Sequence, residues 1–469
     1  MDKGVTPLET RLAVLPRTQA LVDLRTTLGP IESWRLALSQ GGIDPAPLPN
    51  KLIDVMKKLG YLRIRVFIQE FFRIYDTGHL NWELLDEYMG ALEATGAKVV
   101  AALTIKPRTL FSKIDERVWR PNNVDQWQAL VKEIVKRYGG KRGLITHWEI
   151  GNEPNIGEAG GAPYLIPDPI EYFEYFKMTS EAIRAIDPSA RVGGPAVADA
   201  GPMDSAPPEP LPGFVSLCKQ TGTQLDFVSW HNYCNDAAYH ADSVRYVKKL
   251  VEGMDPTPEL FVTEWNKSFP AVSVADIDGD WGWAGSIVSI GIALLDVGID
   301  WAFYYHVWDQ AIDPEKFSTF LSKASIKRYL DMFNMKPLRL GMFDQEAKVR
   351  APFFALQTFA RLKGDRVKVE IDDFAVKAIA SLDKGNVTLV LASDPYATQA
   401  DRIVDVAIGG DLWHTVDYDL RMIDHRQDWD TKEWELTPRE ERKVWTSGEF
   451  KCQVYLPAGA VAIVHLGKA

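Results

Sequence analysis

The chain has 469 residues, of which 46% are hydrophobic and 25% are charged, and these are ordinary proportions for a globular protein. That length has room for a large domain and a smaller second one. The formal net charge of -11 argues against nucleic acid or an anionic membrane surface as the main partner.

Cysteine usage and the N-terminus bear on the cellular compartment. The three cysteines, Cys218, Cys234 and Cys452, are widely spaced and form neither a metal-binding pattern nor a disulfide framework, which favours a reducing compartment. Residues 1–7 lack the apolar segment of a signal peptide, and no run of about 18 apolar residues predicts a membrane span. We therefore expect a cytoplasmic location, or secretion if a signal peptide has been removed, and no membrane partner.

Residues 33–362 alternate between short β-prone runs and longer segments whose apolar residues recur with helical spacing. The predicted strands are 34–38, 62–68, 98–103, 144–152, 190–197, 226–231, 260–264 and 300–306. The helices predicted after them are 49–59, 84–92, 124–138, 169–186, 212–220, 240–253, 281–296 and 351–362. Eight strand–helix steps predict an α/β fold, namely a (β/α)8 TIM barrel. A doubly wound parallel sheet is the alternative, but no glycine-rich phosphate loop follows an early strand.

The pattern changes after residue 362. Short alternating runs at 387–391, 403–408 and 460–464 are separated by turn residues, which predicts an accessory β-sandwich domain over 363–469. Residues 1–32 are a mixed lead-in that can add a strand to this domain. The segment 309–346 is long for a barrel loop, and we expect it to wall one side of a cleft.

The first candidate catalytic group is Glu153. An apolar run beginning at Leu144 leads into His-Trp-Glu-Ile-Gly-Asn-Glu-Pro-Asn at 147–155, and a loop rich in glycine and proline follows. This pattern predicts a buried strand whose C-terminal end presents the carboxyl group of Glu153. A plain turn is the structural alternative, because proline stops a strand and asparagine favours turns.

A second carboxylate, Glu264, has the same setting in Leu-Phe-Val-Thr-Glu-Trp-Asn at 260–266. Glycoside hydrolysis needs two such groups, one to protonate the leaving oxygen and one to act at the anomeric carbon. Because all strands of a parallel barrel end at one face, both side chains can reach the same cavity.

These motifs carry a resemblance to the retaining glycoside hydrolases of clan A, most closely to family 39, the β-xylosidase and α-L-iduronidase group. Residues 148–155 resemble the acid/base motif of that family, and residues 263–266 resemble its nucleophile motif. The segments 226–233 and 192–196 resemble its sixth and fifth strands, and residues 456–461 resemble the end of its accessory β-domain. The resemblance covers most of the predicted barrel.

The resemblance implies roles for particular residues. Glu153 is the expected general acid/base, and Glu264 is the expected nucleophile that forms a glycosyl-enzyme. The other implied substrate-site residues are Asn152 for the sugar 2-hydroxyl, Arg65 and Tyr233 as hydrogen-bond donors to the nucleophile, and His231 as a pocket wall. Such a pair needs carboxyl groups about 5–5.5 Å apart. The acid needs a raised pKa, and we expect the arginine and tyrosine donors to lower the pKa of the nucleophile.

Other positions bear on the choice of sugar. Phe67 stands where the family usually has histidine, and Gly151 stands where it often has tryptophan. Lys106 can recognise the carboxylate of a uronic acid, although a solvated loop charge is the plainer interpretation of such a residue. Trp308, just after the eighth strand, is the expected aromatic floor for a sugar ring.

The function predicted from these residues is a retaining glycosidase without a cofactor or metal, acting on an oligosaccharide or glycoside. A β-xylosidase-like exo-enzyme is the first choice, with another β-glycosidase, a uronide hydrolase or an endo-glycanase as alternatives. A carbohydrate-binding pseudoenzyme is a further alternative, but binding alone does not need both carboxylates. A metal-dependent hydrolase is disfavoured because no His-x-x-x-His pair is present. The acidic run 276–280 is no EF-hand, because Ile287 occupies the position of the bidentate glutamate.

Overall fold

The first domain is a closed barrel of eight parallel strands. The computed structural model describes residues 15–76, 78–200, 210–268, 280–335 and 339–469. Around the barrel the strands follow the order β10-β11-β2-β3-β6-β7-β8-β9, and each pairs in parallel with its neighbours. Their bounds are β2 (Leu36–Ser39), β3 (Arg63–Ile68), β6 (Lys98–Leu103), β7 (Ile145–Ile150), β8 (Arg191–Val197), β9 (Phe227–Tyr233), β10 (Glu259–Asn266) and β11 (Trp301–Tyr305). The predicted TIM barrel is confirmed.

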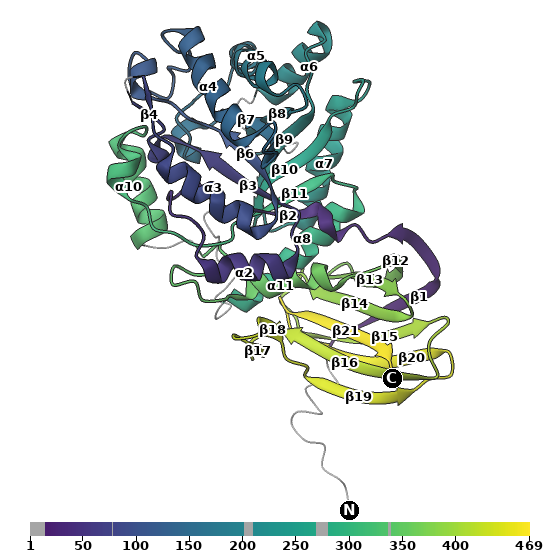
Figure 1. Ribbon diagram of the computed structural model, residues 1–469. Helices are drawn as coiled ribbons and strands as arrows, with labels where there is room; N and C mark the ends of the chain where they lie inside the picture. The colour runs from purple at the N-terminus through teal and green to yellow at the C-terminus, as the bar shows by residue number, and fades with distance from the viewer. Residues whose placement is uncertain (1–14, 77, 201–209, 269–279, 336–338) are drawn as a thin grey trace, which may run out of the picture.

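Helices surround the barrel strands (Figure 1). The eight that follow the strands are α2 (Asn50–Leu59), α3 (Glu83–Thr95), α4 (Val124–Tyr138), α5 (Pro169–Ile186), α6 (Leu211–Thr221), α7 (Ala237–Val251), α8 (Ala284–Asp296) and α11 (Ala351–Arg361). Several of these helices begin at a short polar residue whose side chain accepts hydrogen bonds from the first backbone amides. Asn123, Asp168 and Asp236 are the N-caps of α4, α5 and α7. Among the described helices, none has the length and apolarity that a bilayer span requires.

Short elements decorate the loops. They are η1 (Ser33–Arg35), η2 (Glu70–Phe72), β4 (Tyr75–Asp76), β5 (His79–Leu80), η3 (Arg108–Leu110), η4 (Gly157–Gly160) and η5 (Asp280–Trp283). The long connection from β11 to α11 carries α9 (Pro314–Phe317), α10 (Lys323–Tyr329) and the π-helical turn η6 (Leu330–Met335). Residues 276–279 of the acidic run lie outside the described residues.

The second domain is a nine-stranded mixed sheet in the order β19-β16-β21-β14-β13-β12-β1-β15-β20. Its strands are β1 (Arg17–Pro30), β12 (Asp365–Ile371), β13 (Val376–Asp383), β14 (Asn386–Ser393), β15 (Arg402–Gly409), β16 (Thr415–Ile423), β19 (Glu440–Trp445), β20 (Glu449–Leu456) and β21 (Val461–Lys468). A separate hairpin joins β17 (Trp429–Asp430) to β18 (Glu435–Leu436). The N-terminal strand β1 lies between β12, to which it is antiparallel, and β15, to which it is parallel.

This sheet curls until strands near its two ends face each other. Tyr418 of β16 and Phe450 of β20 have ring centroids 5.3 Å apart, although six strands separate β16 from β20 in the sheet order. Side chains from both halves form one buried cluster, which includes Leu389, Val404 and Leu466. The arrangement therefore has the two facing layers of the predicted sandwich.

The β-domain packs against the barrel at α8 and α11 (Figure 1). The amide of Gly285 in α8 donates to the carbonyl of Gly459 at 2.9 Å. A Cβ atom on Gly285 would lie 2.1 Å from the carbonyl oxygen of Ser393, so only glycine allows the helix to approach this closely.

Candidate active site

Glu153 lies in a tight turn directly after β7. Gly151 has φ 94° and Glu153 has φ 46°, and both values lie in the left-handed region that favours glycine. The φ of Gly151 explains why a glycine stands at this position. The amide of Glu153 donates to the carbonyl of Ala196 in β8 at 2.8 Å. The turn is thereby fixed against the neighbouring strand, with the carboxyl group at the mouth of the barrel.

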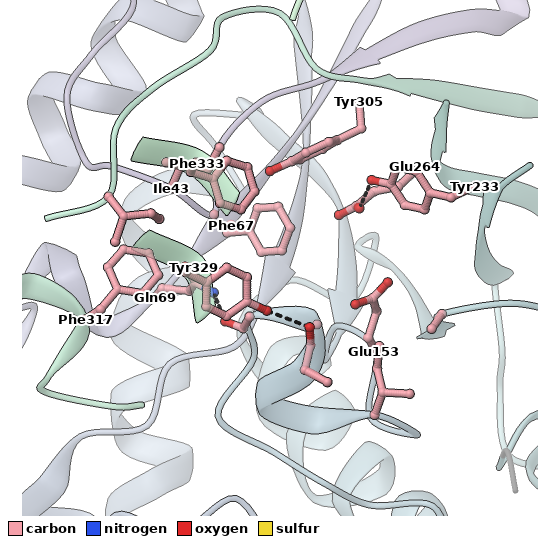
Figure 2. A pocket seen from close by; sticks show the side chains of 17 residues that line it. Ile43, Phe67, Gln69, Glu153, Tyr233, Glu264, Tyr305, Phe317, Tyr329 and Phe333 are labelled. Atoms are coloured by element: carbon pink, nitrogen blue, oxygen red, sulfur yellow. Dashed lines mark hydrogen bonds between the residues drawn. The ribbon is translucent and has the colours of Figure 1, made fainter. Parts of the chain in front are cut away.

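The carboxyl groups of Glu153 and Glu264 face one another (Figure 2). One oxygen of each, together with a ring nitrogen of His231, lies within 4.8 Å of the others. Both glutamates are buried. The two strands β7 and β10 therefore bring together two carboxyl groups that are far apart in the sequence.

Arg65 of β3 is the centre of the hydrogen-bond network beneath this pair. Its guanidinium donates to Glu264 Oε1 at 2.6 Å, to Glu149 Oε2 at 2.6 Å and to Asn152 Oδ1 at 2.8 Å. Tyr233 donates its hydroxyl to the other oxygen of Glu264 at 2.6 Å. Both oxygens of Glu264 are therefore held by donors, and these bonds favour its ionised form.

The surroundings shift the pKa values of the two glutamates. Burial raises the pKa of Glu153 well above its ordinary value, and the charge of Glu264 adds to the rise while Arg65 opposes it. Burial also raises the pKa of Glu264, against the lowering effects of Arg65 and Tyr233. The lowered pKa expected for Glu264 is thus not what the structure shows, because the expectation counted the donors and left out burial. Among the described residues, no lysine or arginine forms an ion pair with Glu153, whereas Arg65 pairs with Glu264, so Glu153 is the group that better retains its proton.

His231 of β9 lies between the two carboxyl groups. Its Nδ1 is 2.9 Å from Glu153 Oε1 and 3.6 Å from Glu264 Oε2. Burial, together with the charge of Arg65, lowers the pKa of His231 well below its usual range, so the ring is neutral at pH 7. A neutral imidazole can orient the Glu153 carboxyl group without forming an ion pair with it.

Glu153, His231 and Glu264 are also close enough to share a metal ion. The guanidinium of Arg65 already contacts Glu264, and its positive charge opposes a second cation at that carboxylate. Both oxygens of Glu264 already accept hydrogen bonds from Arg65 and Tyr233, which suits an ionised carboxylate that acts as a nucleophile.

Comparison with known proteins gives a family. The model of glycosyl hydrolases family 39 matches residues 50–437, which is most of the chain. The chain belongs to glycosyl hydrolases family 39. The match covers the barrel from α2 onward, without β2, and continues into the β-domain as far as residue 437.

Individual family 39 relatives are distant. The chain is 25% identical over 347 residues to a β-xylosidase of Caldicellulosiruptor saccharolyticus, covering 68% of this chain and 65% of that protein. It is 24% identical over 317 residues to a β-xylosidase of Geobacillus stearothermophilus, covering 58% of this chain and 60% of that protein. The aligned part of the chain thus spans less than two thirds of either relative. A monomeric β-xylosidase from Caulobacter crescentus CB15 shares the fold with a TM-score of 0.72 at 20% identity, covering 96% of this chain and 99% of that chain.

A pocket of about 250 Å³ opens next to the two glutamates. Its lining residues are Gly42, Ile43, Phe67, Gln69, Glu153, Ile156, Ala159, Gly160, Gly161, Ala198, Tyr233, Glu264, Tyr305, Ile312, Phe317, Tyr329 and Phe333. They come from the ends of β2, β3, β7, β8, β9, β10 and β11 and from the connection between β11 and α11. That connection contains the segment 309–346 expected to wall the cleft, and Figure 2 shows Phe317, Tyr329 and Phe333 on the side away from Glu264.

The eight residues predicted from the sequence to form the site fall into three groups: residues that line the pocket, residues buried against the two glutamates, and residues outside the pocket lining. Glu153, Glu264 and Tyr233 line the pocket. Arg65, Asn152 and His231 are buried against the two glutamates by the contacts given above. The remaining two, Lys106 and Trp308, lie outside the described lining of the pocket.

Lys106 is buried and donates its amine to the carbonyls of Asp115 at 2.7 Å and Pro163 at 2.8 Å. Burial lowers its pKa to about 8. Trp308 borders a separate shallow hollow with Asp44 and Gln345. Neither side chain is among the described residues that line the pocket of the two glutamates, and their role in sugar binding stays a prediction.

Several lining residues have no signal in the sequence. Gly160 is one, because a Cβ atom there would lie 1.8 Å from Glu153 Oε2, so glycine leaves space for the carboxylate. The carbonyl of Gly160 also accepts a hydrogen bond from the amide group of Asn152 at 3.2 Å. Ile312, Phe317 and Phe333 belong to the long connection, whose folding against the barrel no local pattern reveals.

Proposed function

We propose that this family 39 protein is a retaining exo-glycosidase that removes a terminal sugar by double displacement. The observation that supports this most is the short distance between the two carboxyl groups, one oxygen of each lying within 4.8 Å. Retaining pairs are about 5–5.5 Å apart, whereas inverting pairs are about 6.5–9.5 Å apart to admit a water molecule.

In the first step Glu153 donates its proton to the glycosidic oxygen. Glu264 attacks the anomeric carbon, so that a bond from carbon to the Glu264 oxygen forms while the bond to the leaving group breaks. The raised pKa of Glu153 keeps the proton available for this step. Arg65 and Tyr233 keep Glu264 ionised and oriented.

In the second step Glu153, now a carboxylate, takes a proton from water. The resulting hydroxide attacks the anomeric carbon, and the bond to Glu264 breaks. Two successive inversions return the sugar to its original anomeric configuration, and Glu153 regains its proton.

A β-xyloside is the first candidate substrate, because both curated relatives compared above are β-xylosidases. Exo action is supported by the long connection between β11 and α11, whose residues 312–333 wall one side of the pocket. A uronide is the second candidate from the sequence. It is less well supported, because no lysine or arginine is present among the described residues that line the pocket.

The test is hydrolysis of a panel of 4-nitrophenyl glycosides (xyloside, glucoside, galactoside, arabinoside, glucuronide and iduronide) by the wild type and by Glu264→Ala. We expect the wild type to cleave at least one member and the variant to lose at least about a thousandfold in kcat, as removal of a catalytic nucleophile does. Azide added to Glu264→Gly should restore turnover and yield a glycosyl azide of inverted configuration. If the wild type cleaves no glycoside and still binds sugar, the protein is a binder and the proposal fails.

A further inference from the structure

The pocket beside the two glutamates, which we call the chamber, is mainly apolar. Apart from the catalytic Glu153, Glu264 and Tyr233, its described wall offers polar side chains only at Gln69, Tyr305 and Tyr329. The rest of the wall is aliphatic or aromatic or consists of glycine and alanine. Figure 2 shows Ile43, Phe67, Phe317 and Phe333 gathered on one side.

Each of the three remaining polar side chains already donates one hydrogen bond to a backbone carbonyl. Tyr305 donates its hydroxyl to the carbonyl of Gly41 at 3.1 Å. Tyr329 donates to the carbonyl of Ala159 at 2.7 Å, and Gln69 donates its amide to Gly161 at 3.2 Å. A sugar in this chamber would find few free donors in the described wall away from the catalytic group.

We place the glycone, the sugar that is released last, in this chamber because both Glu153 and Glu264 line it. Asn152, which the family resemblance assigns to the 2-hydroxyl of that sugar, is bonded to Arg65 of β3 and to Gly160. Gly160 is itself part of the chamber, and Phe67 follows Arg65 by two residues on β3. A sugar that meets Asn152 therefore lies against the wall that contains Gly160 and Phe67.

The aromatic side chains of this wall pack against one another. The ring centroids of Phe317 and Tyr329 are 6.5 Å apart, and those of Tyr329 and Phe333 are 5.9 Å apart. The ring centroid of Phe71, which does not line the pocket, lies 6.1 Å from that of Phe317. Packed aromatic side chains of this kind keep their positions, so the wall is not free to turn polar groups toward a ligand.

A buried hydroxyl group without a partner is unfavourable, whereas C–H surface gains from contact with these rings. We propose that the chamber selects a glycone poor in free hydroxyls beyond its 2-hydroxyl, that is, a deoxy or O-alkylated sugar. This inference rests on the proposed function and specifies its substrate class.

The test compares 4-nitrophenyl glycosides that differ in one hydroxyl: the β-D-glucoside with its 6-deoxy analogue, and the β-D-xyloside with its 4-deoxy analogue. We expect kcat/KM to be at least about tenfold higher for one deoxy member of a pair. A ratio of about tenfold corresponds to the free-energy cost of burying one hydroxyl group without a hydrogen-bond partner. A parallel pair, hexyl and 6-hydroxyhexyl β-D-xyloside, varies the leaving group instead. A preference confined to that pair would place the apolar chamber on the aglycone side and overturn the proposal.

Ile312→Gln is the variant that adds polar atoms to the wall. The amide and carbonyl of Ile312 are held by the side-chain amide of Asn334, at 2.7 and 2.8 Å, so the glutamine would start from the same backbone position. We expect the deoxy preference to fall about tenfold relative to the wild type. Because this is a ratio between two enzymes, the higher intrinsic reactivity of deoxy sugars cancels. Ile170→Gln on the exposed surface of α5 is the matched control and should leave the ratio unchanged.

Binding of the S-linked analogues of both glycone pairs, measured by calorimetry, separates this inference from the proposed function. Tighter binding of a deoxy analogue supports the chamber assignment even if the wild type hydrolyses nothing. Efficient hydrolysis of fully hydroxylated glycosides, with no deoxy preference in rate or binding, would leave the glycosidase proposal standing and overturn this one.

Discussion

At the scale of single residues, the chemistry depends on two carboxyl groups with different neighbours. Glu264 receives hydrogen bonds from Arg65 and Tyr233, whereas the carboxyl group of Glu153 lies 2.9 Å from a ring nitrogen of the neutral His231. The same burial therefore leaves Glu264 as the group that ionises first and Glu153 as the group that keeps its proton. This difference in hydrogen-bond partners is a physical reason to assign Glu153 as the acid and Glu264 as the nucleophile, which the order of the motifs in the sequence does not supply.

The pH profile follows from the raised pKa of Glu153. The first step needs Glu153 protonated, so kcat/KM should fall as pH rises through its pKa, and this limb should lie well above the ordinary pKa of 4.5. Glu153→Gln should abolish the limb for a 4-nitrophenyl glycoside, because the glutamine side chain has no carboxyl proton to lose. The measurement is kcat/KM against pH for both proteins. A basic limb that survives in Glu153→Gln would assign the titration to another group.

At the scale of elements, the pocket depends on how the connection from β11 to α11 is attached. Glu158 in η4 accepts hydrogen bonds from the amide of Ser322 at 3.0 Å and from the hydroxyl of Ser325 at 2.8 Å. Arg328 donates to the carbonyl of Glu158 at 2.9 Å. The turn that follows Glu153 therefore holds the start of α10, and with it the apolar wall.

Glu158→Gln should weaken this attachment, because charge-assisted hydrogen bonds become neutral ones. The expected cost is about 1–2 kcal/mol of local stability. We expect KM to rise more than kcat falls, and limited proteolysis within 309–335 to become faster. Glu174→Gln, an exposed substitution on α5, is the control. Unchanged KM and unchanged cleavage would show that other contacts carry the attachment.

At the scale of the whole molecule, two domains are joined by backbone approach at α8. Gly285→Ala would put a Cβ atom 2.1 Å from the carbonyl oxygen of Ser393 and 2.8 Å from that of Gly459, and neither backbone atom can move alone. We expect a loss of about 2–4 kcal/mol in the free energy of unfolding and a lower Tm. Calorimetry of the full chain measures both quantities.

Gly90→Ala in α3 provides the matched control, because an added Cβ atom meets nothing within 4 Å there. Alanine is the better helix former by about 1 kcal/mol, so this change should raise the stability slightly. Equal effects of the two substitutions would mean that the approach of α8 to the β-domain does not limit stability.

The sequence by itself determined the barrel and the pair of glutamates. Strands such as 98–103 and helices such as 124–138 and 169–186 were predicted with the bounds that the structure has. These features are readable because strand and helix periods, caps and strand-end motifs are local, and local pattern sets which backbone conformation a segment adopts. The eight alternations then leave few topologies other than a barrel.

Only the tertiary structure decided what surrounds the two glutamates. The apolar chamber joins Ile43, Phe67, Ile312 and Phe333, which are far apart in the chain. The position of Lys106 was also decided by the tertiary structure, because its amine donates to backbone carbonyls outside the pocket. So was the pairing of β1, which lies between β12 and β15, two strands from the other end of the chain. Contacts of this kind arise when separate segments bury their apolar faces together, and the free energy of that burial depends on the assembled surface, not on any one segment.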